Sequence, residues 1–131
     1  MTRLQQLRKL EARLVKATCA DRALDRDIAL AIGWRMFRGR WKNERNETCR
    51  DLWKFTGSID AALTLVPEGM RYGVCEMQSP TTPQPPRFHG WVIPRDSCLA
   101  DDEIEGYSEA SPAIAFCLAA TRALIAQETN V

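Results

Sequence analysis

The segment that most constrains the fold is the apolar run PAIAFCLAATRALIAQ, residues 112–127. Ser111 can cap a helix, because its hydroxyl accepts a hydrogen bond from a free backbone N–H, and Pro112 suits the first helical position. Apolar residues lie on more than one face of this helix, so it cannot rest on a surface with one side in water. We therefore expect a helix over 112–127 that is largely buried against a sheet.

In two segments that precede this helix, successive side chains fall on alternate faces, as they do in a β-strand. The segments are MRYGVCEMQ (70–78) and FHGWVIP (88–94), and the four prolines of 79–86 between them exclude a continuous ladder. We expect the two strands to pair antiparallel across that loop. DLWKFT (51–56) predicts a further short strand, whereas the acidic stretch 96–110 predicts an irregular connection.

Helical spacing of apolar residues predicts three more helices. Leucines at helical intervals indicate a helix over 2–17, and Asp21 is a plausible cap for a second helix over about 22–32. Ser58 caps a short third helix over 58–66. In chain order the elements are αα-β-α-β-β-α. This order indicates an α+β fold, with a small, mainly antiparallel sheet of 3–4 strands flanked by helices on both faces.

Length and composition are those of one globular domain. The chain has 131 residues, enough for a real core, so we expect 1–131 to form a single α-β-α domain. No apolar run approaches the roughly 20 residues that span a bilayer, and the first residues lack the apolar core of a signal peptide. We therefore expect a cytoplasmic protein whose five cysteines are reduced.

The charge is unevenly distributed along the chain. Residues 1–54 hold 14 Lys/Arg and 7 Asp/Glu, a balance of +7, and residues 55–131 hold 4 and 10, a balance of −6. This asymmetry is compatible with a basic binding face, with two halves that attract each other in the fold, or with a self-complementary dimer. Solvated surface charge is the more common explanation.

No pattern typical of catalysis or of metal binding is present. His89, the only histidine, has no Cys or His at ligand spacing, so a hydrogen-bonded structural role is expected. Cys75 and Cys117 occupy positions typical of core thiols. The acidic run from Asp101 to Glu105 lacks the spacing of a calcium loop and predicts a solvated loop. We expect no catalytic residues, no metal and no cofactor, although a Cys–His pair that meets only in space stays open.

The segment with most binding potential is the basic, aromatic stretch 34–50. Arginine forks match phosphate and carboxylate oxygens, and aromatic faces stack on bases or anchor protein interfaces. The alternative is that the tryptophans are core and the arginines are solvated flank. The candidate partner- or ligand-binding residues are Arg35, Arg38, Arg40, Trp41, Lys42 and Arg45.

Three blocks of sequence resemble one family in order and spacing. They are RALDRDIALAIGW (22–34), FTGSIDAALTLVPEGMRY (55–72) and SPAIAFCLAATRAL (111–124). Together they resemble the phage alpha–beta–alpha (ABA) sandwich family of small phage and prophage proteins, over roughly residues 4–126. Met70 stands where the family usually has an aromatic residue such as Trp. The resemblance implies helices flanking a small antiparallel sheet and a setting in bacteriophage genomes, and it carries over no catalytic residue.

These observations predict a non-enzymatic bacteriophage or prophage accessory protein that acts by binding in the host cytoplasm. Inhibition of a bacterial anti-phage defence system is the role that we favour. The expected partner is a bacterial host protein or a nucleotide signal; nucleic acid is less favoured, and no membrane contact is expected. One alternative is a homo-oligomeric phage structural or morphogenesis factor, and a less favoured one is a small hydrolase that uses His89 or a cysteine.

Overall fold

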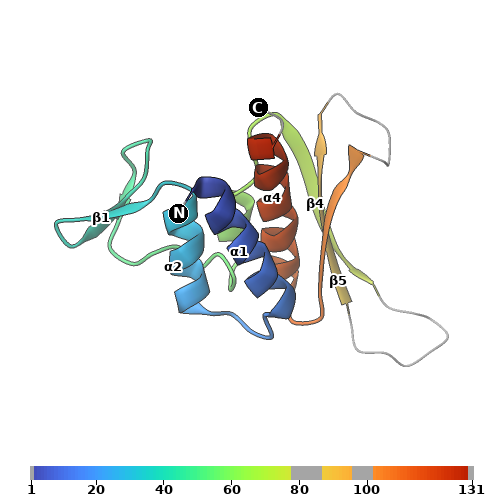
Figure 1. The fold of residues 1–131 in the computed structure, drawn as a ribbon. Coiled ribbons are helices and arrows are strands. Elements are labelled where there is room, and N and C mark those ends of the chain that lie inside the picture. Colours follow the sequence, from blue (N-terminus) through green and yellow to red (C-terminus); the bar gives the residue numbers. More distant parts are fainter. Residues whose placement is uncertain (1, 78–86, 96–101, 130–131) are drawn as a thin grey trace.

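The C-terminal helix α4, Pro112–Thr129, lies at the centre of the fold. The structure is a computed structural model, and it describes residues 2–77, 87–95 and 102–129. Eleven of the 18 residues of α4 are buried. The helix lies between a three-stranded sheet and helix α1, Arg3–Lys16 (Figure 1). The expected burial of this segment against a sheet is therefore confirmed.

The larger sheet is antiparallel, with the strand order β4-β5-β6. Its strands are β4 (Met70–Met77), β5 (Arg87–Pro94) and β6 (Ile104–Ser108). We call the face that packs on α4 the inner face and the opposite one the outer face. A Cβ on Gly90 would lie 2.8 Å from the Ala115 carbonyl oxygen, and one on Gly106 would lie 2.6 Å from it. Glycine at these two positions therefore lets helix and sheet approach closely.

Two antiparallel helices form the N-terminal part of the fold, because each has a capped start and an apolar stripe. Thr2 and Gln5 form a capping box at α1, and Asp21 accepts from two backbone N–H groups at the start of α2, Arg22–Ala31. Helix α1 packs on α4 and on α2 through its buried leucines. Both predicted helices are confirmed, with ends that differ by one residue.

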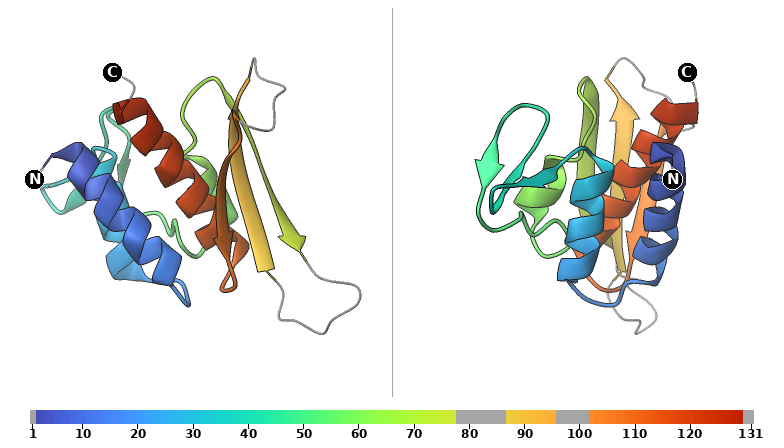
Figure 2. Two further views of the ribbon diagram at one scale, coloured as in Figure 1. Left: turned by 45° about the vertical axis from the view of Figure 1, so that its right-hand side comes forward. Right: turned by 60° about the vertical axis from the view of Figure 1, so that its left-hand side comes forward.

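A smaller antiparallel sheet lies on the other side of the helices from the larger sheet (Figures 1 and 2). Its order is β1-β2-β3. The strands are β1 (Arg35–Phe37), β2 (Arg40–Lys42) and β3 (Thr48–Cys49). The sheet is attached to the core by Trp41, which is buried in the same cluster as Trp34. The smaller sheet therefore projects to one side of the helices, whereas the larger sheet packs on α4.

Helix α3, Ile59–Leu63, is shorter than the predicted 58–66. Ser58 caps it, because its hydroxyl accepts from the Ala61 N–H. After Leu63 the backbone tightens into bonds between residues three apart, such as Leu65 N–H to the Ala62 carbonyl. The helix ends in these turns before it reaches Pro67.

The predicted α+β class, with helices flanking antiparallel sheets, is confirmed. The arrangement differs in one respect from helices on both faces of one sheet. Among the described residues, α4 is the helix that packs on the larger sheet, and no helix covers the outer face (Figure 2). The expected antiparallel pairing of 70–78 with 88–94 is confirmed as β4 and β5, and the expected loop 79–86 lies outside the described residues.

The predicted strand 51–56 is wrong, because this segment is irregular and ends in a turn. Side chains take the place of a strand partner. The Leu52 carbonyl accepts from the Arg22 guanidinium at 2.8 Å, and the Phe55 carbonyl accepts from the Cys117 thiol at 3.1 Å. Leu52 and Phe55 are both buried, whereas a half-buried strand would alternate.

The irregular connection predicted for 96–110 is wrong for residues 104–108, which form β6 along β5. The inner positions of β6 are Ile104, Gly106 and Ser108, so the hydrophobic alternation that marks a strand is weak. Gly106 is small because α4 needs the space. The close packing of β6 on α4 therefore requires a glycine where a large apolar residue would have marked the strand in the sequence.

Candidate functional site

Two regions outside the core carry chemically useful side chains. The first is the smaller sheet and its loops, residues 34–50, which we call the basic arm. The second lies on the outer face of the larger sheet, and we call it the outer-face cluster. Its members are Cys75, His89, Glu103, Glu105 and Tyr107.

A tight hairpin forms the tip of the basic arm. Arg38 and Gly39 have φ angles of 50° and 79°, so both adopt the left-handed conformation of a two-residue turn. Phe37 therefore pairs with Arg40, and Arg35 pairs with Lys42. Directly paired residues point to the same side of a sheet.

The hairpin consequently has two unlike faces. The outward face holds Arg35, Phe37, Arg40 and Lys42, all exposed. The other face holds Met36 and Trp41. Simple alternation along the chain would place Met36 with Arg40, but the two-residue turn changes the parity between the strands and places Met36 with Trp41.

Trp41 differs from the other candidate residues of the basic arm because it is only 7% exposed. It belongs to the core cluster with Trp34, whose ring lies 5.1 Å from that of Trp53. Trp41 holds the hairpin against the body and is not available to stack on a ligand. For the tryptophans, the alternative interpretation as core residues is therefore the one that the structure shows.

The candidate cations of the basic arm have different surroundings. Arg35 donates to the Leu30 and Trp34 carbonyls at 2.8 and 2.7 Å, so it closes the end of α2. Arg38 lies over the Phe37 ring, 5.2 Å from its centroid. In the described part of the chain, Arg40 and Lys42 form no ion pair and remain exposed.

Arg45 lies apart from the other cations, at the base of the basic arm. It lines a pocket of about 410 Å³ together with Trp34 and Trp53. Glu44, Glu47 and Glu68 also line this pocket, beside Arg3. Its charge is therefore mixed, and a multiply charged phosphate would meet carboxylates there.

Sheet register builds the outer-face cluster. Cys75 pairs with His89 across β4 and β5, and His89 pairs with Tyr107 across β5 and β6. Glu105 lies two residues from Tyr107 on β6 and thus on the same face. Glu103 directly precedes β6. Five polar or reactive side chains thereby meet on a face that no described helix covers.

Contacts within the outer-face cluster are specific. The Cys75 Sγ lies 3.9 Å from His89 Nδ1, and His89 Nε2 lies 3.5 Å from Glu105 Oε1. The Tyr107 ring stacks on the His89 ring at 4.6 Å and 12°. Arg87 lies over the Tyr107 ring, 4.9 Å from its centroid. The imidazole is thus held on several sides.

Tyr107 also positions the Glu105 carboxylate, since its hydroxyl donates to Oε2 at 3.2 Å. Loss of hydration raises the pKa of Tyr107, and the hydrogen bond to Glu105 raises it further. The hydroxyl therefore stays protonated at neutral pH and acts as a donor. One oxygen of Glu105 is thereby engaged, and the other faces His89.

Sequence reasoning missed this cluster in two ways. Cys75 was expected in the core and is exposed, which is a correction, whereas Cys117 is buried as expected. His89 was expected to be hydrogen-bonded, which its Nδ1 atom is, to the Cys75 Sγ, but its Nε2 atom is buried without a hydrogen-bond partner. The missing signal was β6, because Glu103 and Glu105 reach His89 only once that strand pairs with β5.

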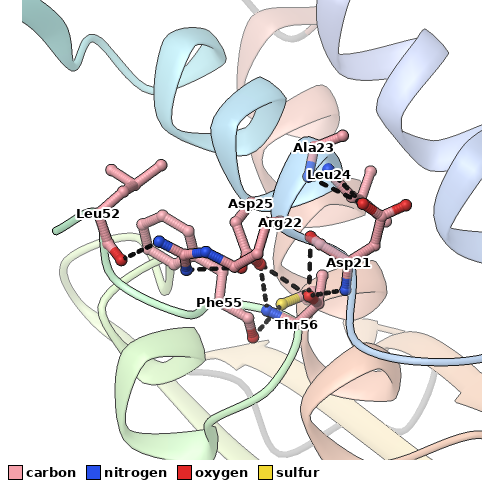
Figure 3. Close-up of polar contacts among 9 residues, drawn as sticks. Asp21, Arg22, Ala23, Leu24, Asp25, Leu52, Phe55 and Thr56 are labelled. Atoms are coloured by element: carbon pink, nitrogen blue, oxygen red, sulfur yellow. Dashed lines mark hydrogen bonds and ion pairs between the residues drawn. The ribbon is translucent and has the colours of Figure 1, made fainter.

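A third polar cluster, around Asp25, is structural (Figure 3). Asp25 is 1% exposed and accepts from the Thr56 backbone N–H and hydroxyl at 2.8 and 2.7 Å. Arg22 donates to its other oxygen at 3.0 Å. Every partner in this cluster is used internally, so it joins α2 to the loop at residue 56 and leaves no group free for a ligand.

In the part of the chain that the structure describes, no helix is long and apolar enough to cross a membrane.

The chain was compared with protein families, with curated proteins and with solved structures. No family model matches the chain, and no curated protein or solved structure matches it. The resemblance to the phage ABA sandwich family therefore stays a prediction.

Proposed function

We propose that the protein acts by binding another protein through the outward face of its basic arm. The observation that carries this proposal is the hairpin face of Arg35, Phe37, Arg40 and Lys42, all exposed and held outward by the buried Trp41. Residues 34–50 contain six Lys/Arg and two Glu, a balance of +4. A partner would therefore carry acidic residues around an apolar contact.

Exposed apolar side chains favour a protein partner. Phe37 is 58% exposed on the outward face at the tip of the hairpin, and Met36 beside it is 55% exposed on the other face. Arginine, methionine and phenylalanine are enriched in protein interfaces, where a few central anchors carry most of the binding energy. Phe37 is the central anchor in this proposal, and the cations around it supply orientation and association rate.

A nucleotide ligand fits the basic arm less well. Trp41 is buried and cannot stack on a base, and the Arg38 guanidinium already covers the Phe37 ring. The pocket at the base of the arm is lined by three glutamates. Of the two partner classes expected from the sequence, we therefore favour the host protein over the nucleotide signal.

The biological setting follows from the family resemblance and is part of the proposal. A bacteriophage or prophage protein in the cytoplasm of its host would use this arm against a protein of an anti-phage defence system. The proposal needs no catalytic group and no cofactor in the arm. It also does not involve the outer-face cluster.

A charge-reversal experiment tests the proposal. R38E/R40E/K42E and the single variant F37A would be compared with R8E/K9E/K16E, which reverses three exposed cations on α1. We expect the arm triple variant to lose the partner captured from phage-infected lysate, and the α1 variant to retain it. With the purified partner, F37A should weaken binding at least about tenfold, as for a central anchor.

Salt dependence and mass provide the controls. Binding of wild type should weaken as ionic strength rises, because exposed charges are screened. Light scattering should show that wild type alone is a monomer; a dimer that the arm variants dissociate would favour the homo-oligomer instead. Equal capture by a folded arm triple variant and by wild type would contradict the proposal.

A further inference from the structure

We propose that His89, Glu103 and Glu105 form a binding site for one divalent transition-metal ion, with Zn²⁺ as the best match. One ligand atom from each residue lies within 4.8 Å of the other two. The three side chains are half-buried on the outer face of the larger sheet. The site is independent of the basic arm and of the proposed protein binding.

The His89 imidazole has one ring nitrogen that forms no hydrogen bond. Its Nε2 atom is buried and has no hydrogen-bond partner, although the side chain is 14% exposed. A buried polar atom without a partner costs free energy, so native structures usually satisfy it with protein, water or an ion. The other ring nitrogen, Nδ1, already faces the Cys75 sulfur. Nε2 is therefore the nitrogen left for a ligand.

The distance between two of the ligand atoms fits a bound metal ion. His89 Nε2 and Glu105 Oε1 are 3.5 Å apart. Two ligand atoms on a tetrahedral zinc ion, each bonded at about 2.0–2.2 Å, lie about 3.4 Å apart. These two atoms can thus bind one ion almost where they stand. The Glu103 ligand atom lies within 4.8 Å of both and would have to move closer to supply the third ligand.

Tyr107 holds two of the ligands in place. Tyr107 donates to Glu105 Oε2 and stacks on the His89 ring, so one side chain orients two ligands. Groups that orient metal ligands in this way are a regular part of metal sites. Two carboxylates held beside one another also repel, and a bound cation removes this repulsion. The arrangement therefore favours a cation over an empty cluster.

The ligand set selects the type of metal. One imidazole nitrogen and two carboxylate oxygens suit zinc and similar transition metals, whereas Mg²⁺ and Ca²⁺ prefer oxygen ligands alone. Three protein ligands leave a fourth tetrahedral position open. In zinc sites of this composition, water or a substrate group occupies that position.

Titration of Zn²⁺ into the full, EDTA-stripped chain by calorimetry tests the site. The variants are H89Q, E103Q and E105Q, and the matched control is E109Q, which neutralises an exposed glutamate one residue beyond β6. We expect one Zn²⁺ per wild-type chain. Each ligand variant should weaken binding at least about tenfold, since even supporting residues cost 10–100-fold. E109Q should bind within about twofold of wild type.

Cobalt spectroscopy separates this site from a cysteine site. Co²⁺ should give a visible spectrum of tetrahedral type without a thiolate charge-transfer band, and C75S should keep it. Circular dichroism in EDTA verifies that each variant is folded; for a ligand variant that does not fold, Y107F takes its place, with a loss of about tenfold expected. Absent saturable binding, equal affinity in the folded ligand variants, or a thiolate band that C75S removes would overturn the proposal.

Discussion

The Asp25 cluster and the outer-face cluster each hold a titratable side chain away from water, and they differ in how its polar atoms are satisfied. Asp25 receives three hydrogen bonds from Thr56 and Arg22, so no oxygen is left unused. His89 has one nitrogen near a thiol and one without a hydrogen-bond partner. A buried polar group with a purely structural role finds all of its hydrogen-bond partners within the chain, as Asp25 does. A buried polar group in a ligand site keeps an atom without a partner, as His89 does.

This contrast has an electrostatic basis. A buried carboxylate is tolerated when hydrogen bonds replace the water that it loses. Asp25 has that compensation within the chain, from groups on α2 and at residue 56. His89 has the Glu105 carboxylate as a neighbour, with Oε1 at 3.5 Å from Nε2. This contact lacks hydrogen-bond geometry, so Nε2 remains without a hydrogen-bond partner. The two clusters should therefore respond differently to substitution and to chemical modification.

The largest expected difference is in thiol reactivity. Cys117 is fully buried and donates to the Phe55 carbonyl, whereas Cys75 is exposed beside His89. Burial raises the pKa of Cys117, and the charge of Asp25 raises it further, so little thiolate forms at pH 8. Iodoacetamide should modify Cys75 at least about 10³-fold faster, because Cys117 reacts only after global unfolding.

Peptide mass spectrometry over a time course measures these rates. In urea-unfolded protein the two cysteines should react at similar rates, which serves as the control. Comparable rates in the native protein would contradict the assignment of Cys117 to the core.

Next in size is the effect of removing the Asp25 carboxylate. D25A leaves the buried Thr56 N–H without its acceptor and the Thr56 hydroxyl with only the Asp21 carbonyl at 3.3 Å, so it should lower the free energy of unfolding by about 3 kcal/mol. D27A is the matched control on the same helix. It removes a half-exposed ion pair with Arg13 and should cost about 0–1 kcal/mol. Urea denaturation measures both, and equal losses would remove the structural role of Asp25.

A smaller loss is expected for T56V, which keeps the shape of the side chain and removes its hydroxyl. That hydroxyl donates to Asp25 at 2.7 Å and accepts from the Asp21 N–H at 2.9 Å. The cost should be about 1–2 kcal/mol by the same denaturation measurement. T56S retains the hydroxyl and should keep most of that hydrogen-bond energy. If T56V unfolded at the same urea concentration as wild type, the Thr56 hydroxyl would not stabilise the fold.

The smallest effect is expected at His89. In EDTA, H89F keeps a ring to stack on Tyr107 and removes both nitrogens, of which Nε2 has no hydrogen-bond partner and Nδ1 has only the long 3.9 Å contact with the Cys75 Sγ. The free energy of unfolding should change by no more than about 0.5 kcal/mol, because replacing an unsatisfied polar atom by an apolar one is nearly neutral. A loss as large as that of D25A would show that His89 is structural and would end the contrast.

Sequence reasoning succeeded where the cause of a structure is local. The starts of α1, α2 and α3 follow from their capping residues, and the burial of α4 follows from its apolar faces. It failed where the cause is another part of the chain. Segment 51–56 is irregular because the side chains of Arg22 and Cys117 donate to its carbonyls. Trp41 is not available for binding because it is buried in the core.

The sequence by itself determined the α+β class, the four helices and the antiparallel pairing of β4 with β5, because caps and side-chain periods act over a few residues. Only the tertiary structure decided which reactive side chains meet. Cys75, His89 and Glu105 lie on three different strands, and the register of the sheet brings them together. Such contacts depend on how strands pair rather than on spacing along the chain, so no local pattern records them.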